Sequence, residues 1–90
     1  MILQIKVKVK ISTIKEFAAK LMSGQLDRSA NISERYCEKS EPTVGISYWK
    51  VENMEEFENL FSSWKEFYET FEVKEVIAAK DAFFLILNQK

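Results

Sequence analysis

The segment from Leu3 to Ile11 reads LQIKVKVKI, and its alternating pattern decides the fold class. The odd positions are all aliphatic, whereas the even positions hold one glutamine and three lysines. A period of two residues together with many β-branched side chains is typical of a strand with one apolar side. The pattern therefore predicts a strand over residues 3–11 that has an apolar face against the core and a cationic face on the other side.

A helix is expected directly after this strand. Thr13 and Glu16 have the spacing of a capping box, in which both side chains bind backbone N–H groups at the helix start. Apolar residues then recur at helical spacing up to Leu21, and Gly24 is suited to end the helix. Residues 25–31 show no periodicity, which indicates a loop.

Two further strands are predicted around a turn at Pro42. Residues 32–39 favour a strand over a helix, although their alternation is blurred. Proline lacks the N–H donor that a strand ladder needs, so Pro42 indicates a turn. Residues 44–52 follow as the third predicted strand, whose pattern is clear, and they are rich in valine, isoleucine and aromatic side chains.

The strongest amphipathic segment begins at Asn53, which is suited to cap a helix and has Glu56 three residues later. At 100° per residue, eight apolar side chains fall within an arc of about 140°, whereas most other side chains are polar. Since aromatic side chains bury large areas, we interpret this stripe as core rather than as a cofactor site. The eight residues are Met54, Phe57, Leu60, Phe61, Trp64, Phe67, Tyr68 and Phe71.

The C-terminal part predicts one more strand, over residues 72–78, and an ambiguous tail over residues 79–89. The run at residues 82–87 is apolar throughout, and periodicity cannot separate a buried strand from a buried helix. Asp81 near its start favours a short helix. The order β-α-β-β-α-β predicts one α+β domain over residues 1–90 with a ferredoxin-like fold, in which two helices cover one face of a four-stranded antiparallel sheet.

The strand at residues 44–52 has bulky apolar groups on both of its sides. If Ile11 and Val51 point toward the helices, then Val44, Ile46 and Tyr48 lie on the opposite face of the sheet. Helices cover only one face of such a domain, so this second face needs another cover. The sequence therefore predicts a symmetric homodimer that pairs the two sheets through these three residues.

Composition excludes several function classes. The chain has no histidine and one cysteine, which removes histidine acid–base chemistry, Cys/His zinc sites and an intrachain disulfide. Cys37 is interpreted as a small apolar residue rather than a nucleophile. The net charge of −1 gives no general attraction to nucleic acid or membranes, and no apolar run approaches the ~20 residues of a membrane span. We predict a cytoplasmic protein with no metal site and no cofactor.

Several of these features together resemble the dimeric α/β-barrel superfamily, in particular its small stand-alone members of unassigned function. They are the element order, Tyr36-Cys37, the turn at Pro42, the segment Val44 to Asn53 and the Glu/Phe-rich second helix. The resemblance implies a homodimer with paired sheets and a ligand cavity between sheet and helices. This superfamily includes cofactor-free monooxygenases, haem-degrading enzymes, isomerases and amino-acid-sensing domains. The chain lacks the histidine that binds haem in the haem-degrading relatives, and no catalytic residue is carried over.

The cationic strand suggests a ligand. Lys6 and Lys8 would point toward a partner, where a lysine without an anion is costly. They are expected to meet Glu34 or Glu38, to extend to the rim, or to bind an anion. The sequence thus predicts a protein that binds a small anionic or aromatic molecule, as a binding or accessory protein or as a cofactor-free enzyme of unknown reaction. The alternative is a structural or protein-interaction module whose second face serves only dimerisation. The candidate ligand-binding residues are Lys6, Lys8, Arg35, Tyr48 and Trp49.

Overall fold

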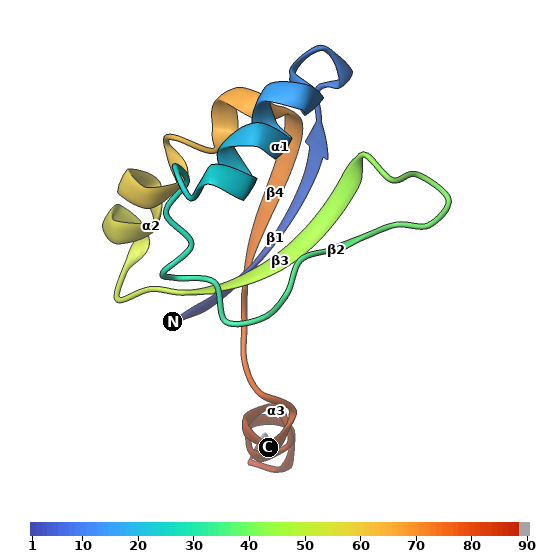
Figure 1. Ribbon diagram of the computed structural model, residues 1–90. Coiled ribbons are helices and arrows are strands. Elements are labelled where there is room, and N and C mark those ends of the chain that lie inside the picture. Colours follow the sequence, from blue (N-terminus) through green and yellow to red (C-terminus); the bar gives the residue numbers. More distant parts are fainter. Residues whose placement is uncertain (89–90) are drawn as a thin grey trace.

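The computed structural model describes residues 1–88 and contains one four-stranded antiparallel sheet with helices over one face (Figure 1). Strand β1 (Ile2–Val9) pairs with β3 (Val44–Lys50) on one side and with β4 (Tyr68–Val76) on the other. The short β2 (Tyr36–Cys37) pairs with β3, so that the strand order is β2-β3-β1-β4. This is the predicted ferredoxin-like α+β arrangement.

Three α-helices and two short 3-10 helices complete the described chain. Helices α1 (Ile14–Ser23) and α2 (Met54–Phe61) lie over the sheet, whereas α3 (Ala79–Leu87) stands beyond its end (Figure 1). The 3-10 helices are η1 (Ile11–Thr13), before α1, and η2 (Lys65–Phe67), before β4. The ambiguous tail is therefore helical as favoured, and Gln89 lies outside the described residues.

The core lies between the sheet and the two helices α1 and α2. Strand β1 supplies its centre, because its aliphatic odd-numbered residues are all buried on the helix side. Their alternation confirms the two-faced strand predicted from the sequence. The core consists of Leu3, Ile5, Val7, Val9, Phe17, Leu26, Ala30, Trp49, Val51, Phe57, Phe61, Trp64, Phe67 and Tyr68.

Strand β1 is two residues shorter at its C-terminal end than predicted. The register with β4 shifts between Lys8 and Val9, and the N–H of Lys10 then donates to the carbonyl of Phe67 at 2.8 Å. This contact turns the chain out of the sheet into η1. Ile11 is consequently 77% exposed, so the expectation that it points toward the helices is wrong.

The two predicted helix caps have different outcomes. Asn53 Oδ1 accepts a hydrogen bond from the N–H of Glu56 at 2.9 Å, as expected for a cap of α2. Thr13 caps nothing, because its hydroxyl donates to the carbonyl of Lys10 at 3.1 Å. That carbonyl lies within reach because η1 winds the chain back before α1 starts. Gly24 ends α1 in the left-handed conformation, with φ of 76°.

Helix α2 ends at Phe61, whereas the apolar spacing predicted a helix through residue 71. The hydroxyls of Ser62 and Ser63 donate to carbonyls three residues earlier, at 2.9 and 3.4 Å, and such bonds weaken a helix. From Tyr68 onward the chain instead pairs with the whole length of β1. Strand β4 therefore begins at Tyr68 and not at residue 72.

The prediction that the aromatic stripe is buried is confirmed for most of its members, but the prediction that it forms one helix is wrong. Its buried members are divided among α2, the following turn, η2 and β4, where they surround the same core. Met54 and Phe71 are only about half covered. The fully buried members are Phe57, Phe61, Trp64, Phe67 and Tyr68.

The strand predicted over residues 32–39 is reduced to the two residues of β2. Upstream, Asn31 forms an isolated bridge with Trp49 of β3. The N–H of Ile32 still donates to the carbonyl of Tyr48 at 3.0 Å, and the following residues up to β2 leave the sheet edge as an irregular loop. Because of this loop, polar side chains lie beside the core. In a regular strand they would lie along the sheet edge.

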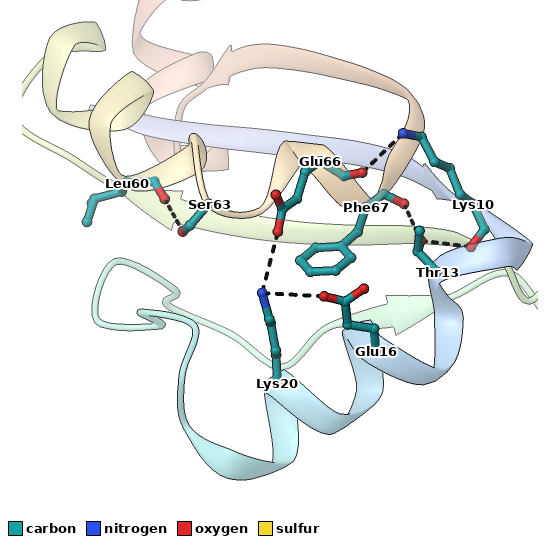
Figure 2. A network of polar contacts seen from close by, with 8 residues as sticks. All are labelled: Lys10, Thr13, Glu16, Lys20, Leu60, Ser63, Glu66 and Phe67. Carbon is teal, nitrogen blue, oxygen red and sulfur yellow. Dashed lines mark hydrogen bonds and ion pairs between the residues drawn. The ribbon is translucent and has the colours of Figure 1, made fainter.

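A polar network on the surface connects α1 with η2 (Figure 2). Lys20 Nζ lies 3.5 Å from the carboxylate of Glu66 and 3.7 Å from that of Glu16. The same ammonium lies 5.2 Å from the ring centroid of Phe67, and Lys10 Nζ donates to the carbonyl of Glu66 at 3.1 Å. Such exposed ion pairs contribute about 0–1 kcal/mol each, so the network orients α1 more than it stabilises the domain.

Candidate functional site

The structure divides the five candidate ligand-binding residues between the two faces of the sheet. Lys6, Lys8 and Tyr48 lie on the face that has no helix, as the register of β1 with β3 requires. Trp49 is buried on the helix side, in the core. Arg35 also belongs to the helix side, because its guanidinium lies against core aromatic rings. The five residues therefore belong to two separate places.

The face without helices, called here the uncovered sheet face, is mixed in polarity. Within the single chain, Lys8 meets a carboxylate as one of the expected alternatives, but its partner is Glu41 at 3.3 Å and not Glu34 or Glu38. A hollow of about 210 Å³ on this face has both basic and acidic side chains in its wall. The register assigns to this face Ile2, Gln4, Lys6, Lys8, Tyr36, Val44, Ile46, Tyr48, Lys50, Thr70, Glu72, Lys74 and Val76.

The three residues predicted at a dimer interface differ in exposure. Val44 is only 7% exposed within a single chain, so it is buried without any partner. Ile46 and Tyr48 are half-buried, and Gln4 Nε2 donates to the Tyr48 hydroxyl at 3.1 Å. The apolar area that this face offers to a partner therefore comes from Ile46 and Tyr48, from Ile2 and Val76 at one end of the sheet, and from the exposed Tyr36 at its edge. A sheet-to-sheet interface through these residues stays a prediction.

On the helix side, Arg35 is a cation among aromatic rings. Its guanidinium carbon lies 5.2 Å from the ring centroids of both Phe17 and Trp64. Arg35 Nη2 donates to the hydroxyl of Tyr68 at 3.3 Å, whereas Nη1 is buried without a hydrogen-bond partner. Within residues 1–88, no carboxylate lies within 4 Å of this guanidinium. Contact with rings compensates part of the cost of a covered cation, and an anion would compensate more.

Two neighbouring side chains also have buried polar atoms without partners. Trp64, which is 0% exposed, has its indole Nε1 unpaired, and both amide atoms of Asn31 are unpaired. The other tryptophan differs, because Trp49 Nε1 donates to Ser47 Oγ at 3.2 Å. Buried polar groups in proteins nearly always have a partner, so three such side chains in one region indicate that a polar partner, either water or a ligand, binds there.

A hollow of about 780 Å³ gives access to this region from the surface. Its wall comes from Leu21 of α1 and from the loop that follows α1, including both Asn31 and Arg35. Beneath Arg35 lies Trp64, whose ring is in edge contact with that of Phe17 at 6.2 Å between centroids. Asn31 and Arg35 line the hollow together with Glu34, whereas Phe17, Trp64 and Tyr68 are buried in the core and do not line it. We call the set Phe17, Asn31, Arg35, Trp64 and Tyr68 the arginine–aromatic cluster.

Tyr68 holds Arg35 in a defined position. Burial raises the pKa of the Tyr68 phenol above its ordinary value of 10.0, and the nearby Arg35 charge offsets only part of this effect. The hydroxyl is therefore protonated at neutral pH while it accepts the hydrogen bond from Arg35. The contact leaves Nη1 as the guanidinium nitrogen available to a ligand.

Sequence reasoning found Arg35 and missed the rest of the cluster. Asn31 falls in a segment without periodicity, and Trp64 and Tyr68 were interpreted as core residues, which they also are. A pattern of apolar residues predicts that a tryptophan is buried. It carries no information on whether the indole N–H has a partner, since that depends on residues distant in sequence.

Comparisons with known proteins place this geometry in a known fold. No protein-family model matches the sequence, and no curated protein matches it. A solved structure named "Putative antibiotic biosynthesis monooxygenase from Bacteriodes thetaiotaomicron VPI-5482" matches 88% of this chain and 89% of its own, with a TM-score of 0.59 and 13% identity. A conserved protein from Methanosarcina mazei Go1 matches 86% of this chain and 94% of its own, with a TM-score of 0.44 and 18% identity.

The likeness to the Bacteriodes structure concerns the fold and not the chemistry of the site, because the sequence identity is low. Among residues 1–88, no helix combines the length and the apolar character that crossing a bilayer requires. The strand order and the likeness to the Bacteriodes structure show that the chain has the ferredoxin-like fold. At the level of the fold, they confirm the resemblance to the dimeric α/β-barrel proteins that was noted from the sequence.

Proposed function

We propose that this protein is a homodimer that binds a small planar molecule carrying an anionic group, with Arg35 as the residue that recognises the anion. One observation carries the proposal: a guanidinium packed between aromatic rings, with a buried unpaired nitrogen and no carboxylate within 4 Å in the described chain. A charge in such surroundings is stabilised most by an anion that enters from outside.

The remaining cluster residues match the same ligand. A guanidinium presents donors in one plane, which suits a carboxylate or a similar planar anion. The Asn31 amide, in the wall of the same hollow, supplies further hydrogen-bonding atoms that lack partners. Leu21 and Ile32 in that wall offer an apolar surface to the body of a ligand, while the rings of Phe17 and Trp64 hold Arg35 from the core side. The proposed function is binding, with the helix-side hollow as the entrance.

The first test compares two probes of nearly the same shape, one an anion and the other neutral. Calorimetric titration is expected to show 2-naphthoate binding about tenfold or more tightly than the neutral 2-naphthamide, since a hydrogen bond to a charged group contributes about 1.5–3 kcal/mol. The variant Arg35→Met keeps an unbranched apolar stem and removes the guanidinium charge, so it is expected to abolish this preference.

Arg28→Met is the matched control, because Arg28 is the other arginine in the chain and lines the same hollow. It should retain the preference for the anion. Equal affinities of the two probes for the unmodified protein, or an equal loss in both variants, would contradict the proposed role of Arg35. Failure of both probes, with no small molecule retained in native mass spectra, would favour the alternative of an interaction module.

We propose further that the homodimer pairs the two uncovered sheet faces. Ile46 lies in the middle of that face, opposite Lys6 in β1 and Tyr36 in β2. Ile46→Glu places a charge on the face of each copy, and burying it without a partner should weaken the dimer about 100-fold. Light scattering after gel filtration is expected to show a change toward the 10.6 kDa monomer.

Ile11→Glu is the control for this substitution. It makes the same chemical change at an isoleucine that is exposed on η1, outside the sheet. The variant should remain dimeric. A dimer that resists Ile46→Glu as well as Ile11→Glu would show that the uncovered sheet face is not the interface.

A further inference from the structure

Asn31 has a buried side-chain amide that the described chain does not use. Its Oδ1 and its Nδ2 both lack a hydrogen-bond partner within residues 1–88. A flip of the amide would exchange the two atoms and leave both without a partner. Asparagine side chains outside helices usually bind nearby backbone groups, as Asn53 Oδ1 does with the N–H of Glu56 at 2.9 Å. The amide of Asn31 forms no such local bond.

Backbone hydrogen bonds hold Asn31 in place without its side chain. Its N–H donates to the carbonyl of Arg28 at 3.0 Å, and the residue forms a bridge with Trp49 of β3. On the two sides of this bridge, backbone hydrogen bonds of 2.7 and 3.0 Å join the neighbouring residues to β3. The amide is therefore attached to a fixed point of the sheet edge, and a partner that binds it does not have to order the backbone first.

The amide lies beside the hollow that leads to Arg35. Asn31 and Arg35 both contribute to the wall of this hollow of about 780 Å³. Within residues 1–88, residues 33–35 form no backbone hydrogen bond with another segment, and the hydroxyl of Ser33 donates to the carbonyl of the adjacent Glu34 at 3.3 Å. Since few bonds resist a small shift of this loop, a ligand in the hollow can reach the covered amide and Arg35 Nη1.

An amide with both atoms free recognises a ligand edge on which a donor and an acceptor lie side by side. It can then form two parallel hydrogen bonds, as asparagine does with the edge of adenine. A lactam or an imide holds N–H and C=O on the same side and presents such an edge. A peptide group is trans, so its N–H and C=O point in opposite directions and only one of them can reach the amide. The free amide therefore favours a cyclic amide over a peptide.

We propose that the ligand of this hollow is a planar anion with a lactam or imide edge, and that Asn31 is the residue that recognises the edge. Arg35 Nη1 binds the anionic group, while the amide of Asn31 forms two hydrogen bonds with the edge. This inference rests on the proposed function, because it names the ligand class of the same hollow. The two contacts are separable, since one depends on charge and the other on a neutral donor–acceptor pair.

Calorimetric titration with bicyclic anions of the same shape tests the inference. The probes are 2-naphthoate and the 6- and 7-carboxylates of isoquinolin-1(2H)-one, two lactams that hold the anion at different distances from the edge. At least one lactam is expected to bind about tenfold more tightly than 2-naphthoate, because it gains two hydrogen bonds to atoms that otherwise lack partners. Methylation of the lactam nitrogen removes the donor and should abolish this gain.

Asn31→Leu removes the hydrogen-bonding atoms and keeps a side chain of similar size. Because the replaced atoms are buried without partners, the variant should fold as well as the unmodified protein by circular dichroism. It should bind the lactams no more tightly than 2-naphthoate and keep the preference for 2-naphthoate over 2-naphthamide, which depends on Arg35. Asn59→Leu is the matched control, since Asn59 is exposed on α2, and it should retain the gain for the lactam.

Three outcomes would overturn the inference. Equal affinities of the lactams and 2-naphthoate for the unmodified protein would mean that water satisfies the amide of Asn31. A gain that persists in Asn31→Leu or with the methylated lactams would mean that Asn31 does not recognise the edge. A gain that is lost equally in Asn59→Leu would mean that the effect is not specific to Asn31. The preference for 2-naphthoate over 2-naphthamide, measured on the same proteins, shows separately whether the proposed function holds.

Discussion

Replacing Ile5 by aspartate is expected to leave most of the protein unfolded in the absence of denaturant. Ile5 is 1% exposed at the centre of β1, where strands β3 and β4 flank it and the core lies above it. Loss of the apolar side chain alone costs about 2–5 kcal/mol, and a buried carboxylate without a partner adds several more. A domain of this size has roughly 5–15 kcal/mol of stability in total. Far-ultraviolet circular dichroism during urea titration provides the measurement.

Lys6→Asp is the matched control, because it introduces the same side chain one residue later on the opposite face. Lys6 is exposed in β1, so this variant should remain folded and lose about 1 kcal/mol through the lower strand propensity of aspartate. Similar stabilities for the two variants would mean that the faces of β1 are wrongly assigned. The comparison therefore tests the period-two pattern on which the fold prediction rests.

Trp64→Ala should lower the free energy of unfolding by about 3–5 kcal/mol, as expected for a large aromatic side chain removed from a core. Trp64 is 0% exposed and has edge contacts with Phe17 and Trp49, at 6.2 and 5.4 Å between ring centroids. Removing it leaves a cavity where α1, the sheet and the turn after α2 meet. Chemical denaturation of the unligated protein measures this effect.

Met22→Ala provides the comparison, because Met22 is 89% exposed at the end of α1. Its truncation should change the stability by less than about 0.5 kcal/mol. A loss of under about 1 kcal/mol for Trp64→Ala would place Trp64 outside the core. That result would also remove the support for the arginine–aromatic cluster, which uses the same side chain.

Prediction from the sequence succeeded where local chemistry decides the structure. The alternation in β1, the cap at Asn53 and the left-handed Gly24 depend on residues within a few positions of one another, so the sequence displays them directly. The capping box at Thr13 was wrong for a related reason. A competing acceptor, the carbonyl of Lys10, exists only because η1 forms.

Prediction was weaker where distant segments compete. The spacing of aromatic residues favoured a helix through residue 71, but pairing with β1 converts Tyr68 onward into a strand. The burial of Trp64 and Phe67 was correct in either conformation, because both arrangements put these side chains against the sheet. A stripe of apolar residues thus predicts what is buried with more certainty than it predicts the backbone that buries it.

The candidate site shows the same division. Its chemistry was partly expected, since Arg35 and an anionic or aromatic ligand were both predicted. Its composition was not, because the loop at residues 33–35 leaves the sheet edge instead of continuing a strand. That departure places Arg35 between Phe17 and Trp64, which are distant from it in sequence.

The sequence by itself determined the two-faced central strand, the order of elements and most of the core, because these depend on the local periodicity of apolar side chains. Only the tertiary structure decided where α2 gives way to β4, which polar atoms are buried without partners, and that α3 lies uncovered. Each of these depends on contacts between residues far apart in the chain, where pairing in the sheet and exclusion of water outweigh local preference.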